Sequence, residues 1–353
     1  MFIQKEKVTT NVKNSWCFTI DENVYAYLNE NWNITIVQSD VHEVVINYHI
    51  NRVHLSKDLL FILKEDNSLI TYDYLKRTYV EYGLDESDKI IWGQDLSKED
   101  IFFSQQISLI EVTTGRLNRK TGIKTIIENF YPCFFVKNLI FGKVNNKIIK
   151  YSIDGGDLWQ FDLQQLGTFF KIGRGNTKIE VFKFLGVFEN DLLVLLNDSS
   201  ILRLDIKTGG LVNRFCLTLF KNTSKELKAI YSNIQLYGDI LVYFRSGKYA
   251  EYCLKDDIIK KEFDIENQLK NKKLHDNAPG YIKENNLLYY FVTGFGSFSL
   301  PSLVVFDLVA KEIIWKDVHN NPNVSYKDFR KNKNNLFVLD SDNTLHIFEK
   351  ESV

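Results

Sequence analysis

Residues Asn334–Phe348 read Asn-Asn-Leu-Phe-Val-Leu-Asp-Ser-Asp-Asn-Thr-Leu-His-Ile-Phe. An apolar run, a short turn of Asp, Ser and Asn, and a second run in which apolar and polar residues alternate are the pattern of a β-hairpin. Residues 58–73 repeat this pattern without a gap, as Asp-Leu-Leu-Phe-Ile-Leu, a turn at 64–67, and Ser-Leu-Ile-Thr-Tyr-Asp. The repeated hairpin is the feature that decides the fold.

Further copies of the hairpin recur along the whole chain. Their starts lie near residues 15, 58, 100, 138, 191, 239, 286 and 335, at intervals of 38 to 53 residues. A period of about 40–50 residues with several strands in each period is typical of the blades of a β-propeller. Only 4 prolines and 14% aromatic residues also favour strands over helices. We therefore expect an all-β chain that forms a single closed β-propeller domain over residues 1–353, with seven or eight four-stranded blades.

The two ends of the sequence complement each other. The hairpin at 334–348 has no fourth strand after it, whereas Phe2–Thr9 reads as a strand with no blade of its own. Pairing of these two segments would complete the last blade and remove exposed strand edges. We expect the N-terminal strand to close the propeller in this way.

Several repeats end in a common pattern. Residues Asp205–Leu211 read Asp-Ile-Lys-Thr-Gly-Gly-Leu, residues Phe306–Trp315 read Phe-Asp-Leu-Val-Ala-Lys-Glu-Ile-Ile-Trp, and Asp157–Leu163 is similar in another register. These segments resemble the pyrroloquinoline-quinone-like and tryptophan-aspartate-like repeats of propeller proteins. In such a repeat the Asp accepts backbone N–H groups of the next turn, Gly supplies a positive φ, and Trp covers the space between neighbouring blades. The resemblance implies a fold but no function, because such repeats occur in quinoproteins, assembly factors and scaffolds.

Composition excludes several classes of function. Lys and Arg number 44 and Asp and Glu 45, so no broad basic surface for nucleic acid or anionic membrane is expected. The first ten residues contain charges where a signal peptide is apolar, and no apolar run is long enough to span a bilayer. The four cysteines, Cys17, Cys133, Cys216 and Cys253, form no Cys-x-x-Cys pair. We expect a soluble cytoplasmic protein in which Cys17, Cys216 and Cys253 are buried free thiols.

No motif for catalysis, cofactor binding or metal binding emerges. The Gly-x-Gly sequences at 173–175 and 294–296 lack a third glycine and a following helix, and no Gly-x-Ser-x-Gly occurs. Residues 340–344 begin like a calcium loop, but Leu345 stands where that loop needs glycine. No two histidines have the spacing of a metal-binding pair; they are His42, His49, His54, His275, His319 and His346. The sequence thus predicts no catalytic, cofactor or metal residue, and no quinone cofactor.

Two segments interrupt the repeats and are candidates for inter-blade insertions. Residues 222–235 are predicted to contain a short helical turn with Ser224 as N-cap, and residues 266–281 a long polar connection. Loops on a rigid scaffold often carry function, and clustered lysines attract acidic partners. The predicted partner-binding residues are therefore the basic and aromatic ones in and around such loops, namely Lys270, Lys272, Lys273, His275, Tyr281, Phe295, Trp92 and Trp32.

These observations favour a non-catalytic protein-binding propeller that is cytoplasmic and monomeric and binds neither nucleic acid nor membrane. The abundance of Lys, Asn, Ile, Phe and Tyr resembles proteins of AT-rich bacterial genomes. A narrower hypothesis is therefore a bacterial immunity or inhibitor protein that binds a toxin or effector through loops on one face. The alternative is an enzyme or small-molecule binder whose site lies at the central channel of the propeller, where residues of separate blades converge.

Overall fold

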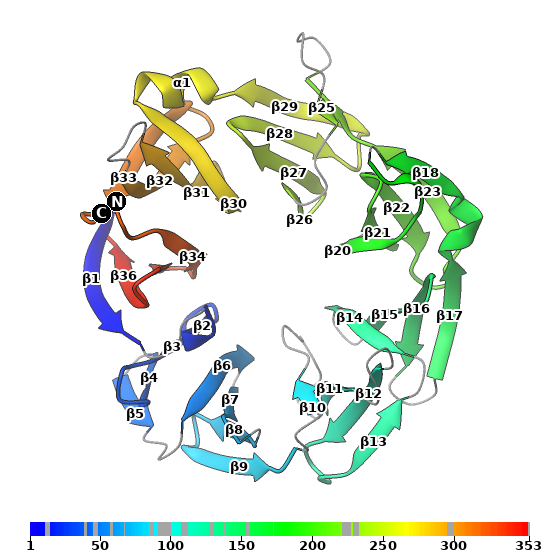
Figure 1. Ribbon diagram of the computed structural model, residues 1–353, viewed down its shortest axis with the longest axis horizontal. Coiled ribbons are helices and arrows are strands. Elements are labelled where there is room, and N and C mark those ends of the chain that lie inside the picture. Colours follow the sequence, from blue (N-terminus) through cyan, green and yellow to red (C-terminus); the bar gives the residue numbers. More distant parts are fainter. Residues whose placement is uncertain are drawn as a thin grey trace. The chain divides into compact units, whose positions relative to one another are not determined.

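The computed structural model describes residues 1–353 except 11–14, 39–40, 45–48, 57–58, 67, 85–87, 91–99, 107–111, 128–129, 137–138, 153–155, 172, 221–226, 229–232, 295–299 and 352–353. Within the described residues the strands form eight four-stranded antiparallel sheets, which are the blades of an all-β propeller fold (Figure 1). The chain divides into two compact units. Unit 1 contains Met1–Glu86 and Glu266–Val353, and unit 2 contains Ser87–Ile265.

Unit 1 holds four blades. Blade 1 follows the short 3-10 helix η1 (Ser15–Cys17) and consists of β2 (Phe18–Ile20), β3 (Tyr25–Leu28), β4 (Ile34–Val37) and β5 (Val41–Val44). Blade 2 consists of β6 (Ile50–Ser56), β7 (Leu59–Lys64), β8 (Leu69–Asp73) and β9 (Thr78–Tyr82). Blade 7 follows the helix α1 (Glu266–Asn271) and consists of β30 (Leu274–Glu284), β31 (Leu287–Gly294), β32 (Pro301–Asp307) and β33 (Glu312–Val318). Blade 8 consists of β34 (Tyr326–Lys331), β35 (Asn335–Asp340), β36 (Thr344–Lys350) and β1 (Phe2–Thr9).

Unit 2 holds the other four blades. Blade 3 consists of β10 (Asp88–Ile90), β11 (Asp100–Gln106), β12 (Val112–Asn118) and β13 (Lys124–Ile127). Blade 4 consists of β14 (Tyr131–Val136), β15 (Leu139–Val144), β16 (Lys147–Ser152) and β17 (Gly156–Asp162), which η2 (Leu163–Leu166) follows. Blade 5 consists of β20 (Val181–Phe188), β21 (Asp191–Leu196), β22 (Ser200–Asp205) and β23 (Leu211–Cys216). Blade 6 consists of β26 (Ile234–Tyr237), β27 (Ile240–Arg245), β28 (Lys248–Cys253) and β29 (Ile258–Asp264).

Two short hairpins lie outside the blades of unit 2. The first pairs β18 (Thr168–Lys171) with β19 (Gly175–Lys178) and precedes blade 5. The second pairs β24 (Thr218–Leu219) with β25 (Leu227–Lys228) and precedes blade 6. The second hairpin overlaps the predicted insertion 222–235, but most of that segment, including Ser224, lies outside the described residues.

The N-terminal strand completes the last blade, as the sequence predicted. Strand β1 pairs antiparallel with β36, in a register that sets Phe2 opposite Lys350 and Thr9 opposite Thr344. The first and last strands of the chain therefore share one sheet, and β36 has a hydrogen-bonded neighbour on each side. Of the two blade counts that the sequence left open, eight is correct.

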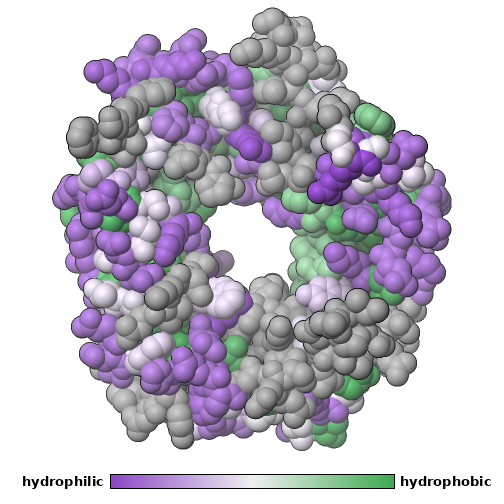
Figure 2. All heavy atoms as spheres, viewed as in Figure 1, coloured by the Kyte–Doolittle hydropathy of each residue, from purple (hydrophilic) through white to green (hydrophobic). Residues whose placement is uncertain are grey.

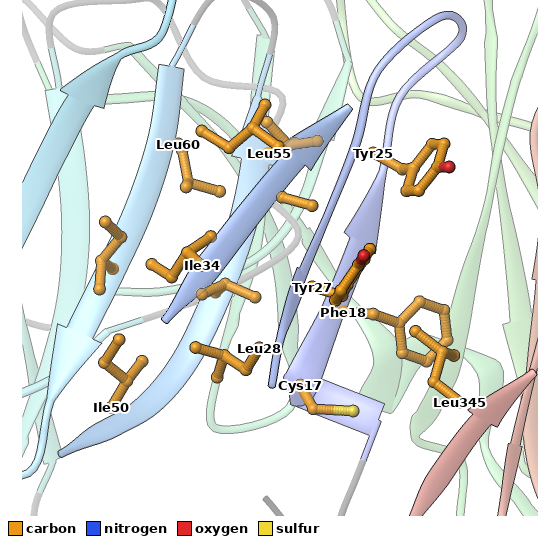
Figure 3. Packing of buried hydrophobic residues seen from close by; sticks show 14 of the residues in the cluster. Cys17, Phe18, Tyr25, Tyr27, Leu28, Ile34, Ile50, Leu55, Leu60 and Leu345 are labelled. Carbon is orange, nitrogen blue, oxygen red and sulfur yellow. The ribbon is translucent and has the colours of Figure 1, made fainter. Parts of the chain in front are cut away.

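Apolar side chains hold consecutive blades face to face. In unit 1 one buried cluster joins blades 8, 1 and 2, with Leu345 from β36, Phe18 from β2 and Leu55 from β6, each at most 5% exposed. Figure 3 shows part of this core between the strands. Blade 4 packs on blade 5 in the same way in unit 2, where Phe141 and Leu192 are both completely buried. Complete burial of a large aliphatic or aromatic side chain contributes about 1.5–3 kcal/mol to stability.

The structure confirms the predicted roles of the repeat-ending pattern. Asp205 ends β22, and its carboxylate accepts the backbone N–H groups of Lys207 and Thr208 at 3.0 and 2.7 Å. Gly209 follows with a φ of 73°. The indole of Trp159 in blade 4 donates to the carbonyl oxygen of Ile206 in blade 5 at 3.1 Å. The indole of Trp315 in blade 7 donates likewise to Phe2 in blade 8, at 3.1 Å.

Three expectations differ from the structure. The hairpin predicted near residue 15 begins instead at Tyr25, because the apolar residues 16–20 form η1 and the first strand of blade 1. The polar segment 266–281 is not a long connection, since it forms α1 and the first part of β30. Cys17 and Cys253 are buried free thiols as predicted, but Cys216 is exposed because it ends the edge strand β23.

Figure 2 shows one face of the described surface. On the face that Figure 2 shows, hydrophilic side chains cover much of that surface, with smaller hydrophobic patches between them. Within the described residues, no helix has the length and apolar character needed to cross a bilayer.

Candidate functional site

Two arginines of unit 1 lie over aromatic rings at the start of blade 1. The guanidinium carbon of Arg52, in β6, is 4.5 Å from the ring centroid of Trp16. The guanidinium carbon of Arg330, in β34, is 4.7 Å from the ring of Phe18. These four residues and His54 are called the arginine–aromatic cluster below. They come from η1 and from the first strands of blades 1, 2 and 8, and a guanidinium over an aromatic face is a cation–π arrangement.

The strand periodicity of β6 explains why Arg52 and His54 share one face. Val53 and Leu55 alternate with them and are buried, at 2% and 5% exposed. Side chains two positions apart in a strand point to the same side, so Arg52 and His54 both lie opposite the core face. The backbone N–H of Leu55 donates to the Thr19 hydroxyl at 2.8 Å, which fixes β6 against β2.

The aromatic side of the cluster is anchored in the core. Phe18 is 1% exposed and its neighbour Cys17 is completely buried. Arg330 donates from Nη1 to the carbonyl oxygen of Phe18 at 3.3 Å, so it contacts both the ring and the backbone of that residue. Trp16 is 44% exposed. One face of the cluster is thus rigidly packed, whereas the indole remains accessible.

The cluster has a positive electrostatic environment. Burial, and then the charge of Arg330, lower the pKa of Arg52 to about 10, so Arg52 stays protonated at neutral pH. Burial, and then the charges of Arg52 and Arg330, lower the pKa of His54 to about 4. An acidic neighbour is present, since Arg330 Nε lies 3.2 Å from the Asp328 carboxylate. That carboxylate does not reverse the effect of the two guanidinium groups on His54, which stays neutral at pH 7.

This arrangement suits recognition of anionic groups. Guanidinium groups bind carboxylates through paired, charge-assisted hydrogen bonds, and Trp and Arg are the side chains that most often dominate protein interfaces. Arg330 is 34% exposed and Asp328 is 33% exposed. A ligand therefore has access to part of the cluster without a change in the fold.

A second polar cluster lies in unit 1 at one end of blade 8. His346 Nε2 is 2.8 Å from Asp340 Oδ2, and His319 Nε2 is 3.5 Å from the same oxygen. The other Asp340 oxygen accepts the backbone N–H groups of Asp342 and Thr344, both at 2.9 Å. Burial acts to raise the pKa of Asp340, but the hydrogen bonds from His346 and the backbone outweigh it and hold that pKa below its ordinary value. The residues 340–344 therefore form the hairpin turn between β35 and β36.

Unit 2 contains a polar pocket with a volume of about 300 Å³. Two lysines and one glutamate provide its charged groups, and its lining residues are Tyr131, Lys143, Asn145, Asn146, Lys147, Leu163, Glu180 and Val181. The Lys147 ammonium donates to Gln160 Oε1 at 3.2 Å, so one of the two cations is already engaged by the protein.

The predicted lysines lie on or beside α1. Lys270 is 55% exposed and pairs with Glu266 one turn earlier, at 2.7 Å. Lys272 and Lys273 are exposed, and Lys273 has a φ of 54° where the helix ends. The ion pair of Lys270 reduces the positive charge that this segment offers to a partner. The lysines do not contact the arginine–aromatic cluster in any observed interaction.

The other predicted residues are placed differently. His275 is exposed on β30, and its ring contacts the Thr293 hydroxyl at 2.5 Å. Tyr281 is 4% exposed, so it packs inside blade 7 instead of facing a partner. Trp32 is half-buried in a turn, with its ring 4.8 Å from that of His49. Trp92 and Phe295 lie outside the described residues.

Trp16, Arg52 and Arg330 were not among the residues predicted from the sequence. A partial signal existed, because Arg52-Val53-His54-Leu55 alternates charged and apolar residues as a strand with one solvent-facing side does. Nothing in the sequence shows that β34 brings Arg330 to the same place, since 278 positions separate the two arginines.

Comparisons with known proteins identify the fold. No family model matches the sequence, and no curated protein matches it. The solved structure of Sqt1 from Saccharomyces cerevisiae aligns over 99% of this chain and 98% of its own, with a TM-score of 0.57 and 10% identity. The computationally designed protein Ika8 aligns over 97% of this chain and 99% of its own, with a TM-score of 0.55 and 11% identity. BamB from Moraxella catarrhalis aligns over 99% of this chain with a TM-score of 0.48 and 10% identity. At such low identity, the likeness to Sqt1 and Ika8 shows a shared fold alone.

Proposed function

We propose that this chain is a non-catalytic, protein-binding propeller and that its arginine–aromatic cluster receives an acidic segment of the partner. The observation that carries the proposal is the stacking of Arg52 and Arg330 on Trp16 and Phe18, beside a histidine that burial, and then the two cations, keep neutral. A carboxylate placed there would be attracted by both guanidinium groups and would face a partly exposed indole. Such a combination of charge and aromatic surface is typical of the centres of protein interfaces.

The contribution of each arginine follows from its environment. Arg52 is half-buried and Arg330 is one-third exposed, so contacts made there are only partly screened by solvent. Loss of one partner of a desolvated charge pair at an interface costs about 2–5 kcal/mol, and a pair in contact with solvent costs less. About 1.4 kcal/mol corresponds to a tenfold change in Kd. We therefore expect removal of one guanidinium to weaken partner binding by about tenfold.

The narrower form of the proposal is an immunity or inhibitor protein in a bacterial cytoplasm, acting as a monomer on a toxin or effector. The Lys-rich, Asn-rich and aromatic-rich composition supports a bacterial origin, and an acidic partner segment fits the positive cluster. The pyrroloquinoline-quinone-like character of the repeats supports only the fold. The lysines beside α1 are a second proposed contact, with Lys272 and Lys273 as the exposed charges.

The test places a photo-crosslinking amino acid, benzoylphenylalanine, at position 16 of the full chain in its source cells. We expect one protein to be captured, with the crosslink in a segment rich in Asp and Glu. The same amino acid at position 79, where Tyr79 is 66% exposed on β9 and outside the cluster, is the control and should give no such product. Equal capture from both positions would contradict the proposal.

A charge-matched pair of variants tests the role of the arginines. The double variant R52Q/R330Q should lower the yield of the crosslink and the affinity for the purified partner by at least about tenfold. The control R77Q/R174Q removes two exposed arginines elsewhere and should leave both unchanged. If no protein is captured but citrate or inorganic phosphate protects the indole of Trp16 from quenching, the small-molecule alternative replaces this proposal. If capture requires neither arginine, the cluster is not the binding site.

A further inference from the structure

His319, Asp340 and His346 bring three potential metal ligands together in unit 1. Their ligand atoms all lie within 4.8 Å of one another, and among the described residues this is the one set of three or more His, Cys, Asp or Glu side chains that does so. The side chains are 14%, 3% and 7% exposed, respectively. These low values place the set inside the surrounding protein, with His319 the most exposed of the three.

Both imidazoles direct the same nitrogen at the carboxylate. Each Nε2 faces Asp340 Oδ2, at 2.8 Å for His346 and 3.5 Å for His319. The His319 Nδ1 atom lies 3.2 Å from the carbonyl oxygen of Asn321, and the His346 Nδ1 atom lies 3.1 Å from the side-chain amide of Gln4. Histidine ligands of metals characteristically donate their other N–H to a carbonyl or similar acceptor, which orients the ring. The Asn321 carbonyl can meet that requirement for His319, although the Asn321 backbone N–H also lies 3.1 Å from the same Nδ1 atom. For His346 the requirement is met only when the Gln4 amide rotates so that its oxygen replaces its nitrogen at Nδ1.

Two of the three ligand-atom distances can be compared directly with those around a small tetrahedral ion, and the third pair, His319 and His346, lies within 4.8 Å. Ligand atoms at about 2.0–2.1 Å from zinc lie about 3.4 Å apart in a tetrahedron. The 3.5 Å separation of Asp340 and His319 matches this value, and the 2.8 Å separation of Asp340 and His346 has to widen by about 0.6 Å. Two imidazole nitrogens and one carboxylate oxygen favour zinc over magnesium or calcium, which prefer oxygen ligands throughout.

We propose that His319, Asp340 and His346 form a Zn²⁺ site with three protein ligands and a water molecule in the fourth position. The site joins separate parts of unit 1. His319 follows β33 of blade 7 and its backbone N–H is held by Pro301, whereas Asp340 and His346 belong to β35 and β36 of blade 8. A bound ion would therefore link blades 7 and 8, and blade 8 is the sheet that β1 completes.

The experiment uses the full chain without an affinity tag, stripped of metal by a chelator and titrated with Zn²⁺ in competition with a chromophoric chelator. We expect one Zn²⁺ per chain, a rise in Tm on binding, and a four-coordinate absorption spectrum when Co²⁺ replaces Zn²⁺. The variants H319Q and H346Q should each raise the Kd for Zn²⁺ by at least about 100-fold. The control H49Q, at a histidine that is 64% exposed and directly precedes blade 2, should not change the Kd.

A third variant separates the metal site from a purely structural hydrogen-bond network. D340N keeps a side-chain oxygen for the two turn N–H groups but loses the anionic ligand, so it should fold and lose Zn²⁺ affinity. If H346Q fails to fold, the test relies on H319Q and D340N, because the new side chains at positions 319 and 340 can still form hydrogen bonds. Absence of one-to-one Zn²⁺ binding in the folded wild-type chain, or binding that H319Q and D340N leave unchanged, would overturn the proposal.

Discussion

Replacement of His54 by Gln tests the positive environment of the arginine–aromatic cluster through the pH dependence of stability. In the folded chain, burial and then the charges of Arg52 and Arg330 lower the pKa of His54 from 6.5 to about 4. In the unfolded chain the imidazole titrates near its ordinary pKa of about 6.5. Between these two pH values the unfolded state therefore binds one more proton than the folded state, and lowering the pH favours unfolding.

The magnitude follows from the two pKa values. The free energy of unfolding should fall as the pH drops below about 6.5, and the contribution of His54 should level off below about 4. At 1.36 kcal/mol for each pKa unit, the difference between the folded and unfolded pKa values of His54 corresponds to about 3.4 kcal/mol in the free energy of unfolding. About 2 kcal/mol of it should be lost between roughly pH 7.5 and pH 5. The variant H54Q carries no titrating group at this position and should not lose this amount.

The assay is urea unfolding of the wild-type chain and of H54Q, followed by tryptophan fluorescence at several pH values across that range. The difference in free energy of unfolding between the two proteins should change by about 2 kcal/mol, to the disadvantage of the wild type at low pH. The Hε1 resonance of His54 in NMR spectra should titrate near pH 4. Parallel pH profiles of the two proteins, or a His54 resonance that titrates near 6.5, would refute the electrostatic reasoning.

Four further outcomes follow from the same structure. Affinity for the acidic partner should rise as the pH falls from 7 toward 5, because a bound carboxylate raises the pKa of His54. Titration calorimetry of the wild type and of H54Q measures this pH dependence of the affinity. G209A should lower the free energy of unfolding by at least about 2 kcal/mol, because Gly209 has a φ of 73° and an added Cβ would lie 2.6 Å from the Trp159 ring. The control for the steric clash is G156A, since Gly156 also has a positive φ but has no atom within 4 Å of an added Cβ. L193A should cost about 2–5 kcal/mol in urea unfolding, because Leu193 is completely buried. Deletion of Phe2–Thr9 exposes the edge of β36, so the shortened protein should have a lower Tm and form oligomers. Size-exclusion chromatography with light scattering measures the mass. An unchanged Tm and an unchanged mass would show that β1 does not stabilise blade 8.

Much of the fold was predictable because the blade repeats a local pattern. Seven of the eight predicted hairpin starts lie within one residue of the second strand of a blade, since an apolar run after a polar pair marks the buried central strand. The exception near residue 15 arose because the first strand of blade 1 is also apolar, with Phe18 in the core. The pairing of Phe2–Thr9 with the last blade was predictable from the missing fourth strand.

The candidate sites were not predictable because they depend on convergence between blades. Arg52 and Arg330 lie on first strands, which the repeated hairpin pattern does not include, and neither has a sequence neighbour that reveals the other. His319 and His346 have no metal-binding spacing, yet the end of blade 7 and strand β36 of blade 8 bring them to one carboxylate. The segment 266–281 looked like a loop because of its polar residues, whereas Leu269 and Tyr281 anchor it to the core.

The pairing of β1 with β36 has a consequence for synthesis on the ribosome. Residues Ser87–Ile265 form unit 2 from one continuous stretch, so all the strands of its four blades are synthesised before residues 266–353. Blade 8 combines residues 2–9 with residues 326–350 and can form only after residues 326–350 have left the exit tunnel. The N-terminal strand must therefore stay unpaired, or be shielded by a chaperone, throughout most of translation. The charged and polar residues Gln4-Lys5-Glu6-Lys7 are suited to an unpaired strand, because alternating charges disfavour its pairing with other chains.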